Sequence, residues 1–189
     1  MARQAASAHG LALILEIRDP ARAALAAGCA DALRIASHHM QNEALLEAAG
    51  ASGRPVILDR APAATVDEWL LSAEALLKAG NYDVILCERG IRSFDPHSRL
   101  ALDAAAIADA KRLSHLPVFA DPSKATGRRD RVLPMARAAV AAGADGLFLD
   151  FHAESGLAHH DGPQALDPHQ FAEAARQAQA IAAAMGRGC

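Results

Sequence analysis

The segment PVILDRAPAATVDEWLLSAEALLKAGNYDVILC, residues 55–87, contains one complete strand–helix–strand unit. Its two ends, residues 55–58 and 83–87, are short apolar runs, as expected for parallel strands that helices cover on both faces. Between them, Thr65 and Glu68 form a capping-box pattern at the start of a helix, and Gly80 stands where that helix should end. The segment therefore predicts a βαβ unit.

The same alternation of short apolar runs and longer alanine-rich segments continues along the rest of the chain, which is typical of an α/β fold. We expect strands at residues 11–17, 32–36, 55–58, 83–87, 117–120 and 146–151, and helices at residues 20–27, 42–49, 65–79, 100–112, 131–142 and 168–185. A closed (β/α)8 barrel has about eight such units, so the pattern fits an open sheet or an incomplete barrel. No linker or change of composition interrupts it, and one domain over residues 1–189 is the simplest prediction.

Composition excludes several classes of function. The chain of 189 residues has 19 Lys and Arg against 22 Asp and Glu, a net charge of −3, so we expect no nucleic-acid partner. No apolar run reaches the roughly 20 residues of a membrane span, and residues 1–10 lack the apolar core of a secretion signal. The three cysteines, Cys29, Cys87 and Cys189, form no Cys-x-x-Cys pair, which favours a reducing cytoplasm over a disulfide framework or structural zinc site.

Polar residues gather directly after the predicted strands, at the edge of a parallel sheet where functional groups usually lie. They are Glu16, Arg18 and Asp19; Ser37, His38, His39, Met40, Gln41 and Asn42; Asp59 and Arg60; Glu88, Arg89 and Arg92; Asp121, Ser123, Lys124, Arg128 and Arg129; and Asp150, His152, His159, His160 and Asp161. Arginines bind carboxylates and phosphates through charge-assisted hydrogen bonds. The candidate substrate-binding residues are therefore Arg60, Arg89, Arg92 and Arg128, although loop charges that only solvate the rim would give the same pattern.

Several ungapped motifs resemble the 3-deoxy-D-arabino-heptulosonate 7-phosphate (DAHP) synthase family, and the resemblance covers nearly the whole chain in order. The motifs are Cys87-Glu-Arg-Gly-Ile-Arg92, His115-Leu-Pro-Val118, Asp121-Pro-Ser123, Ala125-Thr-Gly-Arg-Arg129, Ala141-Ala-Gly-Ala-Asp-Gly146 and Asp161-Gly-Pro-Gln164. The resemblance implies a metal-dependent (β/α)8 barrel that condenses phosphoenolpyruvate with erythrose 4-phosphate, the entry step of aromatic amino-acid biosynthesis.

The resemblance begins near the end of the family's second helix. It implies that the family's first two strands, with their Gly-Pro-Cys-Ser and Lys-Pro-Arg-Thr motifs, have no counterpart in this sequence. The expected fold is accordingly an incomplete (β/α) TIM-type barrel with about six of the eight strand–helix units.

The resemblance also implies a divalent metal, held by a Cys after the first strand and by a His, a Glu and an Asp near the last two strands. Asp161 matches the Asp, Asp150 replaces the Glu, Lys124 replaces the His, and the Cys has no counterpart. The metal site is thus reduced to Asp150 and Asp161, and no cofactor can be assigned. A protonated lysine cannot ligate a metal ion and repels it.

The substrate-binding motifs depart from the family pattern too. The family's Lys-Arg-Gly is Asp59-Arg60-Ala61 here, which places a carboxylate where the family's lysine faces phosphoenolpyruvate. His38 replaces the Arg of the family's Gly-Ala-Arg-Asn motif, whereas Arg89 is the clearest retained match. A like charge beside a bound phosphate costs on the order of a few kcal/mol when desolvated. We therefore expect the standard activity to be lost or altered.

Three interpretations of Lys124 remain open. In the first, Lys124 forms a salt bridge to Asp121, Asp150 or Asp161 that fills the position of the metal. In the second, it is a catalytic Schiff-base lysine whose pKa is lowered by desolvation and by Arg128 or Arg129. In the third, a metal site is rebuilt, and Asp150 and Asp161 are joined by a histidine: His38, His152, His159 or His160. For Cys87 and Trp69 we expect packing roles.

Two classes of function compete at this stage. The chain is either a DAHP-synthase-like aldolase, acting on phosphoenolpyruvate or another oxo-acid, or a catalytically inactive homologue with a partner-binding or regulatory role. A misassigned gene start or a truncated gene would also explain the missing motifs. Unpaired strand edges at residues 11–17 and 146–151 would invite another chain, so we expect a homo-oligomer or a partner that covers them.

Overall fold

The computed structural model describes residues 1–188, so Cys189 lies outside the described residues. The chain divides into two compact units, one from Met1 to Cys87 and one that starts at Glu88. The single domain expected from the sequence remains a prediction.

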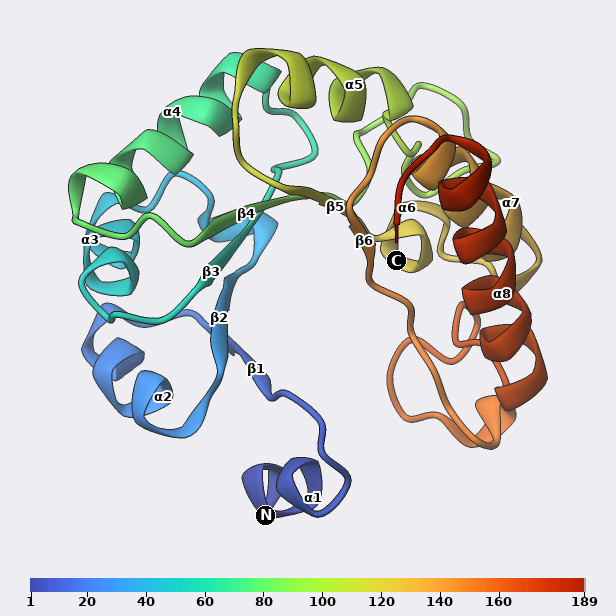
Figure 1. Cartoon of the computed structure of the whole chain (residues 1–189), viewed down its shortest axis with the longest axis horizontal. Coiled ribbons are helices and arrows are strands. Elements are labelled where there is room, and N and C mark those ends of the chain that lie inside the picture. Colours follow the sequence, from blue (N-terminus) through green and yellow to red (C-terminus); the bar gives the residue numbers. More distant parts are fainter. Residues whose placement is uncertain (189) are drawn as a thin grey trace. The chain divides into compact units, whose positions relative to one another are not determined.

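The first unit alternates short strands with helices. Its elements are α1 (Ala2–Ala8), β1 (Ile14–Ile17), the 3-10 turn η1 (Pro20–Arg22), α2 (Ala23–Cys29), β2 (Ala32–Ile35), η2 (Ser37–His39), α3 (Glu43–Gly50), β3 (Val56–Asp59), α4 (Val66–Lys78) and β4 (Val84–Glu88). The strands pair in parallel, in the registers Ile14↔Ala32, Leu33↔Val56 and Val56↔Val84. Helices α2, α3 and α4 cover the same face of these strands (Figure 1).

The core of this unit lies between the strands and α3 and α4. Leu33, Leu58 and Leu76 are completely buried there, and so is Trp69. The indole Nε1 of Trp69 donates to the carbonyl oxygen of Leu58 at 3.1 Å, which fastens α4 to β3. The predicted packing role of Trp69 is confirmed, and Cys87, also fully buried, is a core residue as expected.

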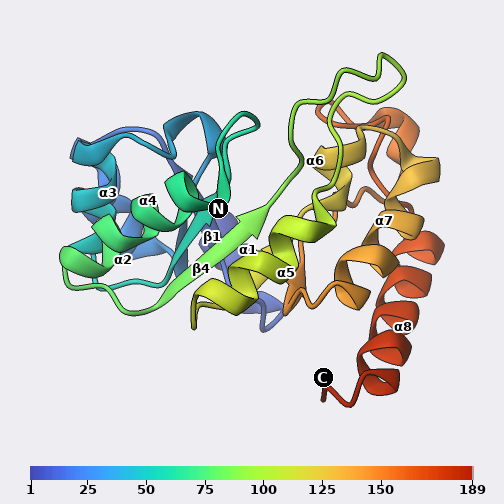
Figure 2. The ribbon, with the colours of Figure 1, turned by 90° about the horizontal axis from the view of Figure 1, so that it is seen from above.

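The second unit contains α5 (Ala104–Leu113), β5 (Val118–Ala120), α6 (Pro122–Thr126), α7 (Arg129–Ala141), β6 (Gly146–Leu147), η3 (Ser155–Leu157) and α8 (Pro168–Ala184). Strands β5 and β6 pair in parallel, with Phe119 opposite Gly146. Helices α7 and α8 pack side by side (Figures 1 and 2), and Val132, Leu166 and Ala174 form a buried cluster.

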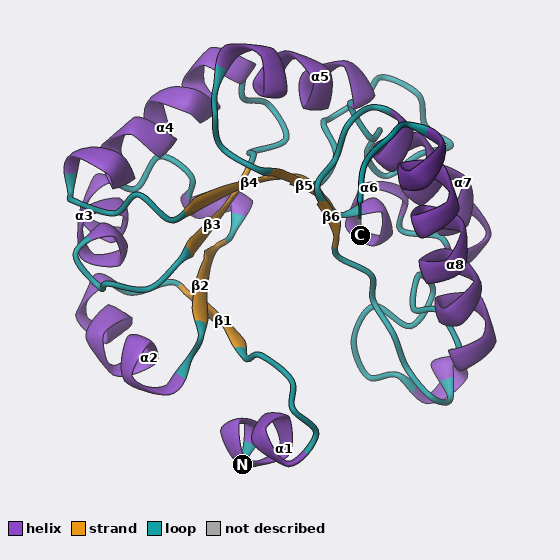
Figure 3. Cartoon of the chain, viewed as in Figure 1, coloured by secondary structure: helices purple, strands orange, loops and turns teal. Residues whose placement is uncertain are grey.

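The fold predicted from the sequence is confirmed. The sheet order is β1-β2-β3-β4-β5-β6. Helices alternate with the strands along the chain (Figure 3), as the expected series of strand–helix units of a TIM-type barrel requires. The capping box of Thr65 and Glu68 is present, and Gly80 and Gly143 have the positive φ expected after a helix. Among residues 1–188, no helix is long and apolar enough to span a bilayer.

Some element boundaries were predicted wrongly. The first strand begins only at Ile14, and β6 ends at Leu147 instead of continuing to residue 151. The helix expected over residues 100–112 starts at Ala104, because Asp103 caps it by accepting a hydrogen bond from the backbone of Ala106 at 3.0 Å. Helices α1 and α6 were missed, since seven and five residues are too short for a helical period to stand out.

Candidate functional site

The candidate site of the second unit is built on the short helix α6, which follows β5. The side chain of Asp121 caps this helix by accepting a hydrogen bond from the backbone nitrogen of Lys124 at 3.0 Å, and Pro122 occupies the first turn. Ser123 and Ala125, on either side of Lys124, are completely buried. The backbone that carries Lys124 is therefore held in place by a cap and by packing.

The side chain of Lys124 reaches two carboxylates. Its Nζ lies 3.2 Å from Oδ2 of Asp150 and also donates a short hydrogen bond to Oδ2 of Asp161. The side chains are 20%, 29% and 36% exposed for Lys124, Asp150 and Asp161, so the cluster is partly shielded from solvent. Lys124 thus forms ion pairs with two of the three aspartates that the salt-bridge interpretation names, Asp150 and Asp161, whereas Asp121 caps the helix.

Asp150 is oriented from two sides. Its backbone nitrogen donates to Oγ of Ser123 at 3.0 Å, which ties it to α6. Its carboxylate Oδ2 accepts a second hydrogen bond, from Nε2 of Gln164 at 2.5 Å, and Gln164 is buried. This side chain therefore has little freedom to turn away from Lys124.

Asp161 occupies a special backbone position. Its φ of 57° is left-handed, a conformation that Asp adopts more readily than most residues, and it is the only such non-glycine residue among residues 1–188. Its carbonyl oxygen accepts hydrogen bonds from the backbone of Gln164 and Ala165, both at 3.0 Å. Arg129 fastens the same turn by donating from Nε to Ala165 and from Nη2 to Gly162.

The electrostatics of the cluster favour the ionised form of Asp161. The hydrogen bond from Lys124 holds the pKa of Asp161 below its ordinary value, although partial burial opposes this effect. The donor set nevertheless does not fit a divalent metal ion, because its third member is an ammonium without a free lone pair. No group of three or more His, Cys, Asp or Glu side chains suited to a metal occurs in residues 1–188, so the hypothesis of a rebuilt histidine site is not supported.

In the first unit, the end of β3 carries a buried carboxylate. Asp59 is 1% exposed, and its Oδ1 accepts a hydrogen bond from Nε of Arg34 at 2.8 Å. Arg34 lies on the neighbouring strand β2 and is 16% exposed. Arg34 was not predicted as a site residue, and the signal that could have found it is a single charged residue within the apolar run 32–36.

The four candidate arginines have different environments. Arg60 is buried in the first unit, where Nε donates to the carbonyl oxygen of Ala64 at 3.0 Å. In the second unit, Arg89 is partly buried, Arg92 is exposed, and Arg128 is exposed and forms a two-bond ion pair with Asp130. Their predicted role in substrate binding remains a prediction.

The four candidate histidines belong to no group of three or more possible metal ligands within residues 1–188. His38, which replaces the family's arginine, is exposed and packs against His39 with ring centroids 4.2 Å apart. His152 accepts a hydrogen bond from the backbone of Glu154 at its Nδ1, while His159 and His160 are exposed.

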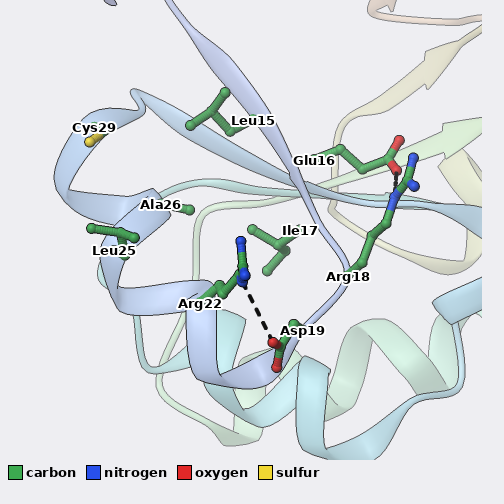
Figure 4. Close-up of a pocket in the computed structure, with 9 residues that line it drawn as sticks. All are labelled: Leu15, Glu16, Ile17, Arg18, Asp19, Arg22, Leu25, Ala26 and Cys29. Carbon is green, nitrogen blue, oxygen red and sulfur yellow. Dashed lines mark hydrogen bonds and ion pairs between the residues drawn. The ribbon is translucent and has the colours of Figure 1, made fainter.

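A cavity of about 560 Å³ lies between β1 and α2 in the first unit. Leu15 and Ile17 point from β1 toward the helix, whereas Glu16 and Arg18 pair on the other side of the strand (Figure 4). Leu25 of α2 lines the cavity and is largely exposed. This cavity is thus an apolar groove. Glu16, Arg18 and Asp19, the polar residues predicted after the first strand, border it and do not converge on a polar site.

Comparison with known proteins gives matches along almost the entire chain. The family model described as "DAHP synthetase I family" matches residues 1–186. The chain is 40% identical over 184 residues to a phospho-2-dehydro-3-deoxyheptonate aldolase of Thermotoga maritima, with 97% of this chain and 54% of the relative covered. A 2-dehydro-3-deoxyphosphooctonate aldolase of Synechococcus sp. is 29% identical, covering 92% of this chain and 65% of that protein.

Solved structures agree with these matches. The crystal structure of the Thermotoga maritima DAHP synthase superposes with a TM-score of 0.96 at 40% identity, over 99% of this chain and 55% of that one. A truncated form of the Thermotoga maritima enzyme superposes with a TM-score of 0.95 at 40% identity, over 98% of this chain and 71% of that one. The chain thus spans about half the length of the relative that it matches at 40% identity.

Proposed function

Because this chain belongs to the DAHP synthetase I family, we propose that it binds a small phosphorylated or carboxylate molecule but does not condense phosphoenolpyruvate with erythrose 4-phosphate. The observation that carries this proposal is the buried ion pair between Asp59 and Arg34. It lies at the position where the family resemblance expects a lysine that faces phosphoenolpyruvate.

The charge at this position is reversed. A phosphate or carboxylate brought close to Asp59 meets a like charge in a shielded environment, which costs on the order of a few kcal/mol. Arg34 balances this charge without adding a surplus, because its guanidinium carries one positive charge and its Nε donates to Asp59. The pair of Asp59 and Arg34 therefore has no net charge at the position where the family resemblance expects a lysine.

Binding of an anion is supported by the arginines of the second unit. Arg89 belongs to the retained Cys87-Glu-Arg-Gly-Ile-Arg92 motif. The residues on either side of it are linked, because Oε1 of Glu88 accepts a hydrogen bond from the backbone nitrogen of Gly90 at 2.6 Å. This anchored turn holds Arg89 in a partly buried position. A guanidinium in such a setting binds carboxylate or phosphate with paired hydrogen bonds.

Turnover and binding assays test the two halves of the proposal. Phosphoenolpyruvate, erythrose 4-phosphate and Mn²⁺ are incubated with the chain, and consumption is followed with and without a chelator. We expect no chelator-sensitive consumption, whereas metal-dependent turnover would contradict the loss of the reaction. In calorimetry, phosphoenolpyruvate should bind the native chain and the exposed-arginine control R112M alike, and R89M should weaken binding by about tenfold. If R89M binds phosphoenolpyruvate as tightly as the native chain does, Arg89 does not contribute to the binding site.

A second candidate function is association with another copy of this chain. The groove between β1 and α2 favours it, since Leu15 and Leu25 lie there and β1 stands first in the sheet order. The charges that border the groove have both signs, as in the pairs Glu16–Arg18 and Asp19–Arg22, so two copies related by a two-fold axis would be complementary. Light scattering should then detect a dimer of the native chain, and the substitution L25E should dissociate it. A native chain that stays monomeric at high protein concentration would contradict this candidate.

The Schiff-base hypothesis for Lys124 has less support. Attack on a carbonyl requires a neutral amine with a free lone pair. The Nζ of Lys124 donates to Asp161 and forms an ion pair with Asp150, and an ammonium held between two carboxylates has no lone pair to offer.

A further inference from the structure

We propose that the Lys124 ammonium is a built-in substitute for a divalent metal ion, so that Lys124, Asp150 and Asp161 form a closed ionic cluster that takes up no metal. This inference goes beyond the proposed function, because it concerns the cation at one site of the second unit and holds whichever small molecule the chain binds. The donor set itself points to it, since two convergent carboxylates face a lysine, and residues 1–188 contain no group of three or more metal-ligating side chains.

The geometry places the ammonium where a cation shared by two carboxylates would lie. Nζ is within hydrogen-bonding distance of one oxygen of Asp150 and one oxygen of Asp161. Two such carboxylates repel one another unless a cation lies between them. The lysine supplies one positive charge to the pair, and the partial burial of all three side chains limits the help that water can give.

The surroundings hold the two carboxylates in place independently of any metal. Ser123 binds the backbone of Asp150, Gln164 binds its carboxylate, and Arg129 fastens the turn that contains Asp161. The amide of Gln164 donates to the same Oδ2 of Asp150 that faces Lys124. This oxygen is thus already engaged by two donors, which leaves it a poor ligand for an incoming ion.

Entry of a metal ion would require Lys124 to leave. The ion would meet an ammonium at close range and would have to replace both of its carboxylate contacts. When the ammonium is removed, the same two carboxylates become available, and a histidine at position 124 adds an imidazole ligand of the type that Co²⁺ and Zn²⁺ accept. The cluster should therefore change from metal-excluding to metal-binding through a single substitution.

The test compares Co²⁺ binding by equilibrium dialysis for the native chain, K124H and K111H. K111H is the matched control, because Lys111 also pairs with a carboxylate, Asp145, in the same unit but faces only that one. We expect K124H to bind one Co²⁺ with an affinity higher than that of the native chain by about tenfold or more, and K111H to resemble the native chain. Circular dichroism verifies that each variant is folded.

Two results would overturn the proposal. One is stoichiometric Co²⁺ binding by the native chain that D161N abolishes, and the other is a folded K124H that binds no more Co²⁺ than K111H. If K124H does not fold, K124M replaces it, and Co²⁺ should then raise the urea midpoint of K124M but not that of the native chain. An equal response of both would also refute the proposal. None of these readouts involves phosphoenolpyruvate, so their failure is distinguishable from failure of the proposed function.

Discussion

Removal of Arg34 should destabilise the first unit by several kcal/mol. In R34M, Asp59 loses the guanidinium that donates to it at 2.8 Å, although the carboxylate stays at a position that is 1% exposed. Loss of one partner from a buried ion pair costs about 3–5 kcal/mol, and the 16% exposure of Arg34 favours the lower end. With a urea slope of about 2 kcal/mol per molar, a loss of about 3 kcal/mol lowers the unfolding midpoint by about 1.5 M.

Trp69 provides the assay. It is the only tryptophan of the chain and is fully buried in the same unit as Arg34, so its fluorescence follows unfolding of that unit. The matched control is R18M, which breaks the exposed pair of Arg18 and Glu16 and should cost no more than about 1 kcal/mol.

The double variant R34M/D59N shows whether the ion pair causes the effect. Without the carboxylate, the loss of Arg34 should matter less, so the double variant should be more stable than the sum of the single changes predicts, by about 1–3 kcal/mol. Additive single effects, or an R34M midpoint equal to that of R18M, would refute the assignment of Asp59 as a buried, arginine-neutralised carboxylate.

Three further predictions concern other parts of the chain. T65A should destabilise α4 by about 1 kcal/mol in urea unfolding, because it removes the side-chain oxygen that accepts a hydrogen bond from the backbone of Glu68 at 3.1 Å; an unchanged midpoint would argue against the cap. The backbone nitrogen of Thr65 donates a hydrogen bond to the Glu68 carboxylate and lowers the pKa of Glu68. The ionised Glu68 therefore stabilises the folded chain above the ordinary pKa of a glutamate, and this stabilisation is lost as the pH falls through the lowered pKa. E68Q should accordingly weaken the acid dependence of the urea midpoint, and an identical pH profile would count against this origin. Borohydride treatment with pyruvate should leave no adduct on Lys124 in mass spectra, since its Nζ serves two carboxylates; a labelled Lys124 would revive the Schiff-base hypothesis.

The strand–helix alternation could be predicted because each strand is a short apolar run and several helices carry their own boundary residues. Thr65 with Glu68 marks a helix start through local hydrogen bonds, and Asp167 with Pro168 marks another through an N-cap residue and a first-turn proline. Helix α6 escaped prediction because its stability comes from the Asp121 cap and from buried neighbours rather than from an amphipathic pattern.

The candidate site was only partly predictable for a similar reason. The family resemblance singled out Lys124, Asp150 and Asp161 at the positions of the metal ligands. The sequence favoured a salt bridge of Lys124 but left a Schiff-base role and a rebuilt metal site open. The contacts to both carboxylates distinguish them, and these depend on loops far apart in sequence. Arg34 was missed because its partner Asp59 lies 25 positions away, on a neighbouring strand whose register no local pattern reveals.

Diffraction from crystals grown with Mn²⁺ would decide whether an ammonium replaces the metal in this member of the family. We expect no anomalous peak between Asp150 and Asp161, with Nζ of Lys124 within hydrogen-bonding distance of both carboxylates. A strong anomalous peak at a ligand distance of about 2.0–2.6 Å from both aspartates, with Lys124 turned away, would contradict this conclusion.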